Sequence, residues 1–216
     1  MTAMILSAGL GTRMRPLTDH TPKPLLKVGD KPLIVWHIER LKASGFSNIV
    51  INVAYLGQQI IEYLGDGSRY GVDIRYSDER DEGALETAGG ILKALPLLSD
   101  TFLVINGDIW TDYPYNCNFS LDRGILAHLL LIDNPEHNLS GDFFLSGTSD
   151  KYTFSGIGYY SKEMFKNLEY GKQPLAPLLF KAIDREELTT EYYRGLWYDI
   201  GTPQRLKLLN QKLSYK

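Results

Sequence analysis

The chain has 216 residues with a formal net charge of −3, and 44% of them are hydrophobic, enough to bury one sizeable core. The absence of a basic excess argues against a general affinity for nucleic acid. The single cysteine, Cys117, excludes a disulfide framework and a cysteine-based metal site. No apolar run reaches the ~18 residues of a membrane span. We therefore expect a soluble, cytoplasmic protein that binds neither nucleic acid nor membrane, as a monomer or small homo-oligomer.

Short apolar runs alternate with helical patterns in the first half of the chain, which predicts a layered α/β sheet. The predicted strands are Thr2–Leu6, Asn48–Val53, Val72–Tyr76 and Phe102–Asn106. The predicted helices are Pro32–Ser44, Gln58–Leu64 and Thr87–Leu95. Glycines follow the first two helices where a C-cap is expected, and the last strand is apolar enough for the middle of a parallel sheet.

The second half is richer in strands and contains no long linker, repeat or low-complexity tract. Its predicted strands are Ile125–Ile132, Asp142–Leu145, Tyr152–Tyr160, Leu188–Tyr193 and Leu196–Ile200. Its predicted helices are Leu175–Ile183 and Pro203–Leu213. We expect a single α/β domain over residues 1–216, with a Rossmann-like, mixed and mostly parallel sheet flanked by helices.

A glycine-rich segment, Ser7-Ala8-Gly9-Leu10-Gly11-Thr12-Arg13-Met14, follows the first predicted strand. A dinucleotide-binding fingerprint would need a third glycine in place of Met14 and a helix starting at once. The prolines at positions 16, 22 and 24 instead predict an extended loop. A Walker-type loop is also excluded, because the only Gly-Lys of the chain, at 171–172, is followed by Gln173.

The remaining interpretation is an open loop that wraps the phosphates of a nucleoside triphosphate. Gly9 and Gly11 allow the backbone to approach the phosphates, and successive N–H groups can form an anion nest. Arg13 offers a planar fork for phosphate oxygens, and Lys23 offers a compact charge. The alternative is a flexible surface turn with solvated basic side chains. Arg13 or Lys23 considered alone would favour that alternative.

The run Gly-Leu-Gly-Thr-Arg-Met-Arg-Pro-Leu-Thr, followed by Pro-Lys-Pro-Leu, resembles the signature of the sugar-1-phosphate nucleotidyltransferases. Members of that family condense a nucleoside triphosphate with a sugar 1-phosphate, giving a nucleotide sugar and pyrophosphate. The resemblance extends from the first strand to the last helix. It implies the nucleotide-diphospho-sugar transferase fold, with a nucleotide-binding half at residues 1–115 and a sugar-binding half at 116–216.

A bound triphosphate calls for a divalent cation, and Mg²⁺ prefers carboxylate, phosphate and water oxygens. Asp108 follows a predicted strand, at the edge where open α/β sheets bind ligands, although a plain turn residue is the alternative. The resemblance implies that Asp108 and Asp199 are the two metal ligands. Thr202 and Pro203 suit the N-cap and first position of the last helix, so Asp199 is not needed as the cap. The alternative role of Asp199 is a buried ion pair or a turn.

The implied reaction needs no protein nucleophile, because the sugar phosphate attacks the α-phosphorus directly. The predicted catalytic residues are therefore charged groups that align the reactants. Arg13 would stabilise the β- and γ-phosphates, Lys23 would bind the α-phosphate or the sugar phosphate, and Asp108 would act through Mg²⁺. The predicted nucleotide-binding residues are Ser7, Ala8, Gly9, Gly11, Thr12, Arg13, Lys23, Gly83, Ala84, Leu85, Glu86 and Asn106.

The family reads the base partly with the segment before a mid-domain helix, which is Glu82–Gly90 here. Backbone groups near 83–85 are expected to face a pyrimidine edge, and Glu86 or Thr87 to reach the base or ribose. The alternative is an ordinary helix N-terminus with Glu86 in its first turn. The side chains alone do not distinguish uracil, thymine and guanine.

The sugar region lacks the Glu-Lys-Pro element of glucose- and thymidine-type members. The segments Asp133–Phe143, Phe154–Ile157, Leu85–Thr87 and Trp110–Tyr113 instead resemble the short N-acetylmuramate-1-phosphate uridylyltransferases of cell-wall recycling. That resemblance implies UTP and N-acetylmuramic acid 1-phosphate as substrates. The implied sugar-binding residues are Gly141, Asp142, Phe154, Ser155 and Gly156.

Three alternatives stay open at this point. Gly141 and Asp142 also suit a hairpin turn, since strand-like runs flank them. A mannose-1-phosphate guanylyltransferase would share the motifs of the first half. A nucleotide-sensing subunit without catalysis would also share the fold, but the presence of Arg13, Lys23, Asp108 and Asp199 together favours an enzyme.

Overall fold

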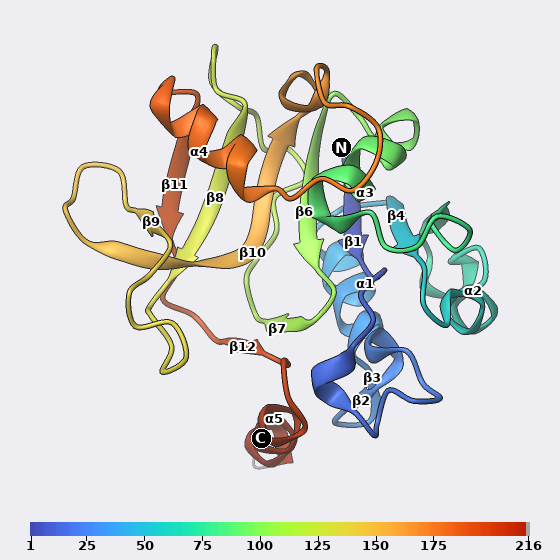
Figure 1. Ribbon diagram of the computed structural model, residues 1–216. Helices are drawn as coiled ribbons and strands as arrows, with labels where there is room; N and C mark the ends of the chain where they lie inside the picture. Colours follow the sequence, from blue (N-terminus) through green and yellow to red (C-terminus); the bar gives the residue numbers. More distant parts are fainter. Residues whose placement is uncertain (215–216) are drawn as a thin grey trace.

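An eight-stranded sheet runs through the computed structural model, which describes residues 1–214 (Figure 1). The strand order is β11-β8-β10-β6-β1-β4-β5, with β9 paired to β10. Strand β1 is parallel to β4 and β6, β4 to β5, and β8 to β11, whereas β10 is antiparallel to its neighbours. The strands of this sheet are β1 (Thr2–Leu6), β4 (Asn48–Val53), β5 (Asp73–Asp78), β6 (Thr101–Asn106), β8 (Ala127–Ile132), β9 (Phe143–Phe144), β10 (Lys151–Ser161) and β11 (Leu188–Tyr192).

Two smaller sheets and five α-helices complete the α/β domain within residues 1–214. The small sheets pair β2 (Lys27–Val28) with β3 (Lys31–Pro32) and β7 (Ile109–Thr111) with β12 (Trp197–Asp199). The helices are α1 (Leu33–Ala43), α2 (Gly57–Leu64), α3 (Glu86–Ala94), α4 (Ala176–Asp184) and α5 (Pro203–Ser214). No helix within residues 1–214 is long and apolar enough to cross a bilayer.

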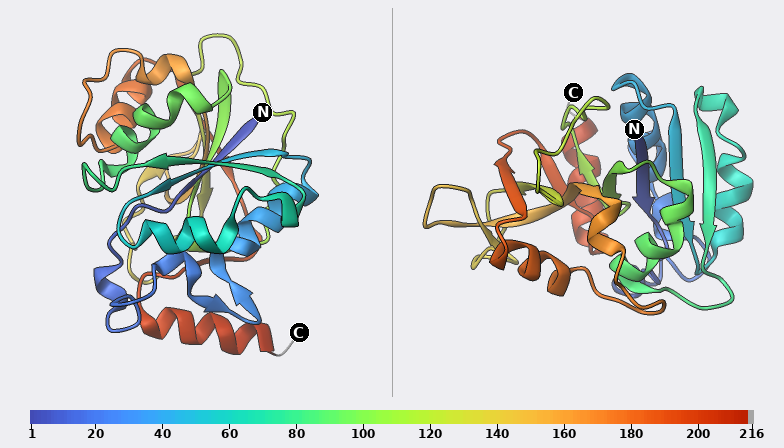
Figure 2. Two further views of the ribbon diagram at one scale, coloured as in Figure 1. Left: turned by 90° about the vertical axis from the view of Figure 1, so that its right-hand side faces the viewer. Right: turned by 90° about the horizontal axis from the view of Figure 1, so that it is seen from above.

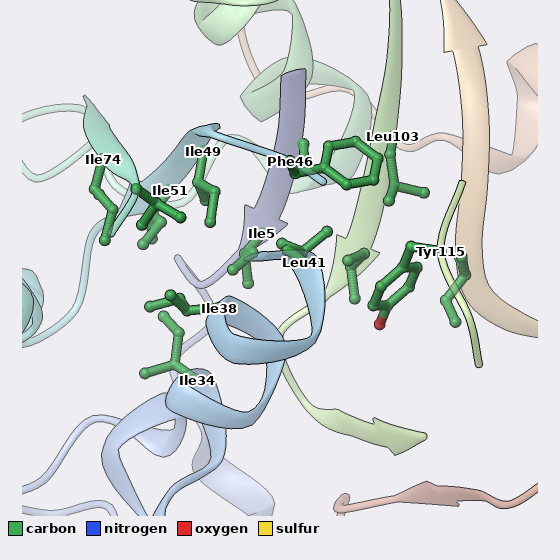
Figure 3. Packing of buried hydrophobic residues seen from close by; sticks show 14 of the residues in the cluster. Ile5, Ile34, Ile38, Leu41, Phe46, Ile49, Ile51, Ile74, Leu103 and Tyr115 are labelled. Carbon is green, nitrogen blue, oxygen red and sulfur yellow. The ribbon is translucent and has the colours of Figure 1, made fainter. Parts of the chain in front are cut away.

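The apolar core lies on both faces of the sheet because successive side chains of a strand point to opposite sides. Ala3 and Ile5 of β1 pack with residues of α1 and α2, whereas Met4 packs with residues of α3 and α4. Figure 3 shows the first of these clusters, in which Ile34, Ile38 and Leu41 of α1 face the sheet. Figure 2 shows the helices on either side of the sheet. The result is the three-layer arrangement that the alternating sequence pattern predicts.

The last helix returns to the N-terminal part of the chain and packs beside β2 (Figure 2). A third apolar cluster joins these parts, and the Gly29 N–H donates to Asn210 Oδ1 at 2.6 Å. Met14, at the end of the glycine-rich segment, is fully buried in this cluster. The C-terminal helix therefore anchors the far end of the glycine-rich loop.

The predicted elements are confirmed to within two residues, and so is the cap of α2 by Gly65. The cap of α1 is Ser44 rather than Gly45, which follows it with a left-handed φ of +87°. The fold class, a mixed and mostly parallel sheet flanked by helices, is also confirmed. Three short strands were not predicted: β2 and β3 have two residues each and β7 has three, too few for a recognisable alternation. They are defined by tertiary pairing, β2 with β3 and β7 with β12.

Candidate active site

A cavity of about 330 Å³ opens where β1, β4 and β6 end, and we call it the loop cavity. Parallel strands bring their carboxyl ends to one edge of the sheet, which is where such folds bind ligands. Its walls include the ends of those strands, the glycine-rich loop and the start of α3. The lining residues are Leu6, Ser7, Ala8, Gly9, Gly11, Arg13, Met14, Lys23, Pro24, Asn52, Glu79, Ala84, Glu86, Thr87, Asn106, Gly107, Asp108 and Gly201.

The glycine-rich loop contains no α-helix, as its prolines predict. It forms a short 3-10 turn at Thr12–Met14, and Gly11 before the turn has a left-handed backbone with φ +63°. The Thr18 hydroxyl donates to the Gly11 carbonyl at 2.7 Å and closes the loop on itself. Arg13 lines the loop cavity, whereas Thr12 is exposed and does not line it. The loop thus presents its glycines and Arg13 to one space.

Lys23 and Asp108 meet across the loop cavity. Lys23 opens a second 3-10 turn, and its Nζ lies 2.8 Å from Asp108 Oδ2. The Asp108 side chain is 39% exposed and that of Lys23 only 11%. The pair therefore joins the proline-rich end of the loop to the end of β6.

Asp199 lies next to Asp108 because of the pairing of β7 with β12. The Ile200 N–H donates to the Asp108 carbonyl at 2.9 Å, and Asp199 pairs in register with Ile109. Thr202 caps α5, accepting from the Arg205 N–H at 3.3 Å, so Asp199 has no capping role, as predicted. Asp199 does form the ion pair considered as its alternative role, with Arg205.

A second small cavity, which we call the carboxylate cavity, is lined by both aspartates. It has a volume of about 330 Å³. His137 also lines it, and His137 Nε2 lies 3.4 Å from Asp199 Oδ2. The residues that line the carboxylate cavity are Asn106, Asp108, Ile109, His137, Asn138, Thr153, Phe154, Ser155, Trp197 and Asp199.

The donor set fits an ion that takes few protein ligands. Within residues 1–214 no group of three or more His, Cys, Asp and Glu side chains could hold a metal. Asp108 and Asp199 form a pair of neighbouring carboxylates, each facing a cationic side chain. Two carboxylates, with phosphate and water oxygens completing the shell, suit Mg²⁺ rather than an ion that needs an all-protein site.

Ala84, before α3, and Glu86 and Thr87, in its first turn, form one wall of the loop cavity. Glu86 has φ +62°, a left-handed conformation that is rare for a residue with a side chain. Gly83 does not line the cavity. Neither does Leu85: its N–H donates to Glu79, its carbonyl accepts from the Gln173 N–H, and its side chain is buried. Both backbone groups of Leu85 thus form internal hydrogen bonds, and its contact with a base stays a prediction.

A wider cavity of about 800 Å³, the hairpin cavity, adjoins the loop cavity at Glu86, Thr87 and Asn106. Gly141, Asp142 and Phe154 line it, which brings together three of the residues predicted for the sugar. Leu175, Leu179, Phe143 and Phe180 give it an apolar wall. It is the widest of the three cavities, and it shares Asn106 and Phe154 with the carboxylate cavity.

Asp142, Ser155 and Gly156, all predicted for the sugar, also support the walls of these cavities. The Asp142 carboxylate accepts from the Phe154 N–H at 2.9 Å and from Asn138 at 3.0 Å, so it holds the hairpin together. Ser155 lines the carboxylate cavity, yet it is buried and donates to the Leu130 carbonyl at 2.7 Å. Gly156, with φ +80°, leaves room for Asn106, because a Cβ there would lie 2.5 Å from Asn106 Nδ2.

Sequence reasoning missed four polar residues of the site: Asn52, Glu79, His137 and Arg205. Glu79 and Asn52 line the loop cavity, and His137 and Arg205 contact Asp199. The available signal was weak. Asn52 and Glu79 stand at the ends of strands, and Arg205 falls in the first turn of a helix, where an anion rather than a cation is favoured.

Comparison with known proteins agrees with this geometry. The family model described as Nucleotidyl transferase matches residues 2–122. N-acetylmuramate alpha-1-phosphate uridylyltransferase of Neisseria meningitidis serogroup B is 52% identical, over 96% of each chain. The catalytic subunit beta of mannose-1-phosphate guanylyltransferase from Danio rerio is 28% identical over 94% of this chain and 62% of its own.

A solved structure gives the same fold. A protein from Bacillus anthracis described as a glucose-1-phosphate thymidylyltransferase, in complex with a sucrose, superposes on this structure with a TM-score of 0.82. The superposition covers 98% of this chain and 95% of the other. Its sequence identity is 23%, so this likeness concerns the fold alone. The family model covers more than half of the chain, and the Neisseria relative covers nearly all of it. The chain belongs to the nucleotidyl transferase family.

Proposed function

We propose that the protein transfers the uridylyl group of UTP to N-acetylmuramate α-1-phosphate, releasing pyrophosphate and the UDP-sugar. The observation that carries this proposal is the 52% identity to the Neisseria uridylyltransferase over nearly the full length of both chains. The reaction would take place in the cytoplasm and return muramic acid to cell-wall synthesis. Its substrates are the nucleoside triphosphate and the sugar 1-phosphate.

The arrangement of cavities supports this reaction. The loop cavity, with its glycines and Arg13, suits the triphosphate, and Arg13 would stabilise the pyrophosphate as it leaves. The hairpin cavity suits an N-acetylated sugar with a lactyl ether, because its apolar wall can pack on methyl groups. Lys23 lies beside Asp108, in position to bind phosphate oxygens where the two substrates meet.

Asp108 and Asp199 would hold Mg²⁺, which would supply positive charge to the α-phosphate and the attacking phosphate. Lys23 and Arg205 now face these carboxylates. Both cations can keep the carboxylates oriented before substrate binds, which lowers the reorganisation needed at the moment of reaction.

Pyrophosphate release tests the proposal. The protein with Mg²⁺ is offered UTP, GTP, dTTP, CTP or ATP, each with N-acetylmuramate, N-acetylglucosamine, glucose or mannose 1-phosphate. We expect the highest kcat/KM for UTP with N-acetylmuramate 1-phosphate. Preference for GTP with mannose 1-phosphate would replace the proposed substrates, and no turnover with any pair would contradict an enzymatic function.

A further inference from the structure

A buried carboxylate, Glu79, forms part of the wall of the loop cavity. Glu79 has 0% relative exposure, and both of its carboxylate oxygens accept hydrogen bonds from the protein. The Asn52 side-chain amide donates to Oε1 at 2.8 Å, and the Leu85 N–H donates to Oε2 at 2.9 Å. On the other side, Asn52 Oδ1 accepts from the Ser7 N–H at 2.7 Å. An unbroken line of hydrogen bonds thus runs from Ser7 to Leu85.

The two ends of this line lie at opposite sides of the loop cavity: Ser7 lines it, and Leu85 stands between Ala84 and Glu86, which line it. Ser7 is the first residue after β1 and begins the glycine-rich loop, and Leu85 precedes α3 in the segment expected to face the base. Asn52 belongs to β4, and Glu79 follows β5. The network therefore connects the phosphate loop to the base segment through the ends of two intervening strands.

The packing around the carboxylate leaves no room for another side chain. A Cβ on Gly90 of α3 would lie 2.8 Å from Glu79 Oε1 and 3.0 Å from Asn52 Nδ2. The glycine lets α3 approach the network closely, so the first turns of α3 and the segment before it are held against β4 and β5. Glu79 is thus fixed from both directions.

Each hydrogen bond of the line has a defined donor and acceptor, and at one position the side chain must accept from both sides. Backbone N–H donors stand at both ends of the line, at Ser7 and at Leu85. Two side chains that link two backbone donors need one group that both accepts and donates and one group that accepts from both sides. Asn52 supplies the amide, and Glu79 supplies the group that only accepts.

Keeping a carboxylate here is unfavourable on its own account. Burial raises the pKa of Glu79 above its ordinary value, while the donors Leu85 and Asn52 oppose that shift. Within residues 1–214 Glu79 forms no ion pair. Both carboxylate oxygens of Glu79 accept hydrogen bonds at the edge of a substrate cavity. A role in the site explains the burial of this acidic group better than a contribution to stability does.

We propose that Glu79, acting through Asn52, is a positioning residue that fixes the distance between the phosphate loop and the base segment. A nucleotide can then contact both segments at once, because their relative position is already fixed before it binds. This lowers the entropy cost of binding. The inference rests on the proposed function only in that the loop cavity binds a nucleoside triphosphate.

Three variants test the direction of the hydrogen bonds. Glu79→Gln sets two amide NH₂ groups against each other, and Asn52→Asp sets two carboxylates together. The double variant Asn52→Asp/Glu79→Gln gives every donor an acceptor again. The carboxylate introduced at position 52 accepts from the Ser7 N–H and from the new Gln amide, whose oxygen accepts from the Leu85 N–H. We expect KM for UTP to rise roughly tenfold or more in each single variant and to return to within about threefold of wild type in the double variant.

Fragment binding separates positioning from a general loss of structure. Uridine and inorganic triphosphate each engage one wall, so calorimetry should give nearly unchanged Kd values for both in Glu79→Gln, while the Kd for UTP rises with its KM. The KM for the sugar 1-phosphate should stay within about twofold. Parallel loss of both fragments and of the sugar, or failure of the double variant to recover UTP binding, would overturn the proposal.

The same experiments keep the two proposals distinct. Turnover of the wild-type protein with UTP and N-acetylmuramate 1-phosphate tests the proposed function. The ratios of Kd between variant and wild type test Glu79, and they are measured on UTP and its fragments without any sugar.

Discussion

Lys23 Nζ lies 2.8 Å from Asp108 Oδ2 and joins two segments that are 85 residues apart in the sequence. The lysine leaves the proline-rich part of the glycine loop, and the aspartate follows β6. Their contact lies in the loop cavity, where the nucleotide is proposed to bind. A cation held beside a proposed metal ligand can take part in both preorganisation and phosphate binding.

Replacing Lys23 should therefore lower the rate more than the affinity. For Lys23→Gln we expect kcat to fall on the order of 10²-fold, because the lost charge faces the phosphates as charge builds in the transition state. The measurement is steady-state pyrophosphate release at saturating substrates. Lys27→Gln is the matched control, since Lys27 is exposed and lies outside the cavities. Equal behaviour of the two variants would contradict a catalytic role for Lys23.

The two aspartates should act as a pair. Asp108→Asn and Asp199→Asn keep the side-chain volume but remove a hard anionic oxygen, so each should lower kcat by at least roughly 10²-fold and raise the Mg²⁺ concentration needed for half-maximal activity. The exposed Asp150→Asn should change neither. If Asp199→Asn kept a normal Mg²⁺ dependence, its ion pair with Arg205 would be its whole role.

Gly156 offers a test of the wall between the cavities. An alanine there meets two penalties: the left-handed φ of +80° and a Cβ only 2.5 Å from Asn106 Nδ2. Gly147 has φ +82° with nothing within 4 Å of its Cβ position, so Gly147→Ala carries the backbone penalty alone.

We expect both alanine variants to lose about 1–2 kcal/mol of unfolding free energy from the backbone. Gly156→Ala should lose about 1–3 kcal/mol more from overpacking and should also lower kcat/KM, because Asn106 lines all three cavities. Urea unfolding and steady-state kinetics measure the two effects. Equal stability and equal kcat/KM in the two variants would show that the Asn106 contact does not matter.

Four charged residues that line the cavities could be named from the sequence because each stands in a local motif. Arg13 and Lys23 belong to one loop, and Asp108 and Asp199 each follow or end a short strand. Their types and spacing carry the chemistry, and the fold only has to bring the strand ends together. The order of the sheet follows from the same pattern, since alternating strands and helices force parallel pairing in the first half.

The supporting residues were not predictable, because their partners are distant. Asn52 accepts from the backbone of Ser7, 45 positions earlier, and His137 meets Asp199 through a loop whose path no local pattern fixes. Glu79 looks like any acidic residue after a strand until its burial is known. Leu85 has a similar limit: its motif predicts contact with the base, but the internal hydrogen bonds of its N–H and carbonyl could not be predicted.

His37 should couple stability to pH. It is buried in α1, and desolvation lowers its pKa to about 4, although a hydrogen bond with the Ile109 backbone acts in the opposite direction. Because the unfolded chain takes up this proton near pH 6.5 and the folded protein only near pH 4, the unfolded state binds more protons between these values. The unfolding free energy should therefore fall as the pH is lowered through this window, by up to about 3 kcal/mol.

Urea unfolding at pH 7, 6, 5 and 4.5 measures this dependence. The variant His37→Gln cannot titrate, so its stability should fall less steeply with acid than that of the wild type, even if it is lower at pH 7. The exposed His20→Gln controls for the loss of an imidazole and should keep the wild-type slope. A His37→Gln protein with the full wild-type slope would show that other groups carry the acid sensitivity, and that His37 is accommodated in the folded protein at little electrostatic cost.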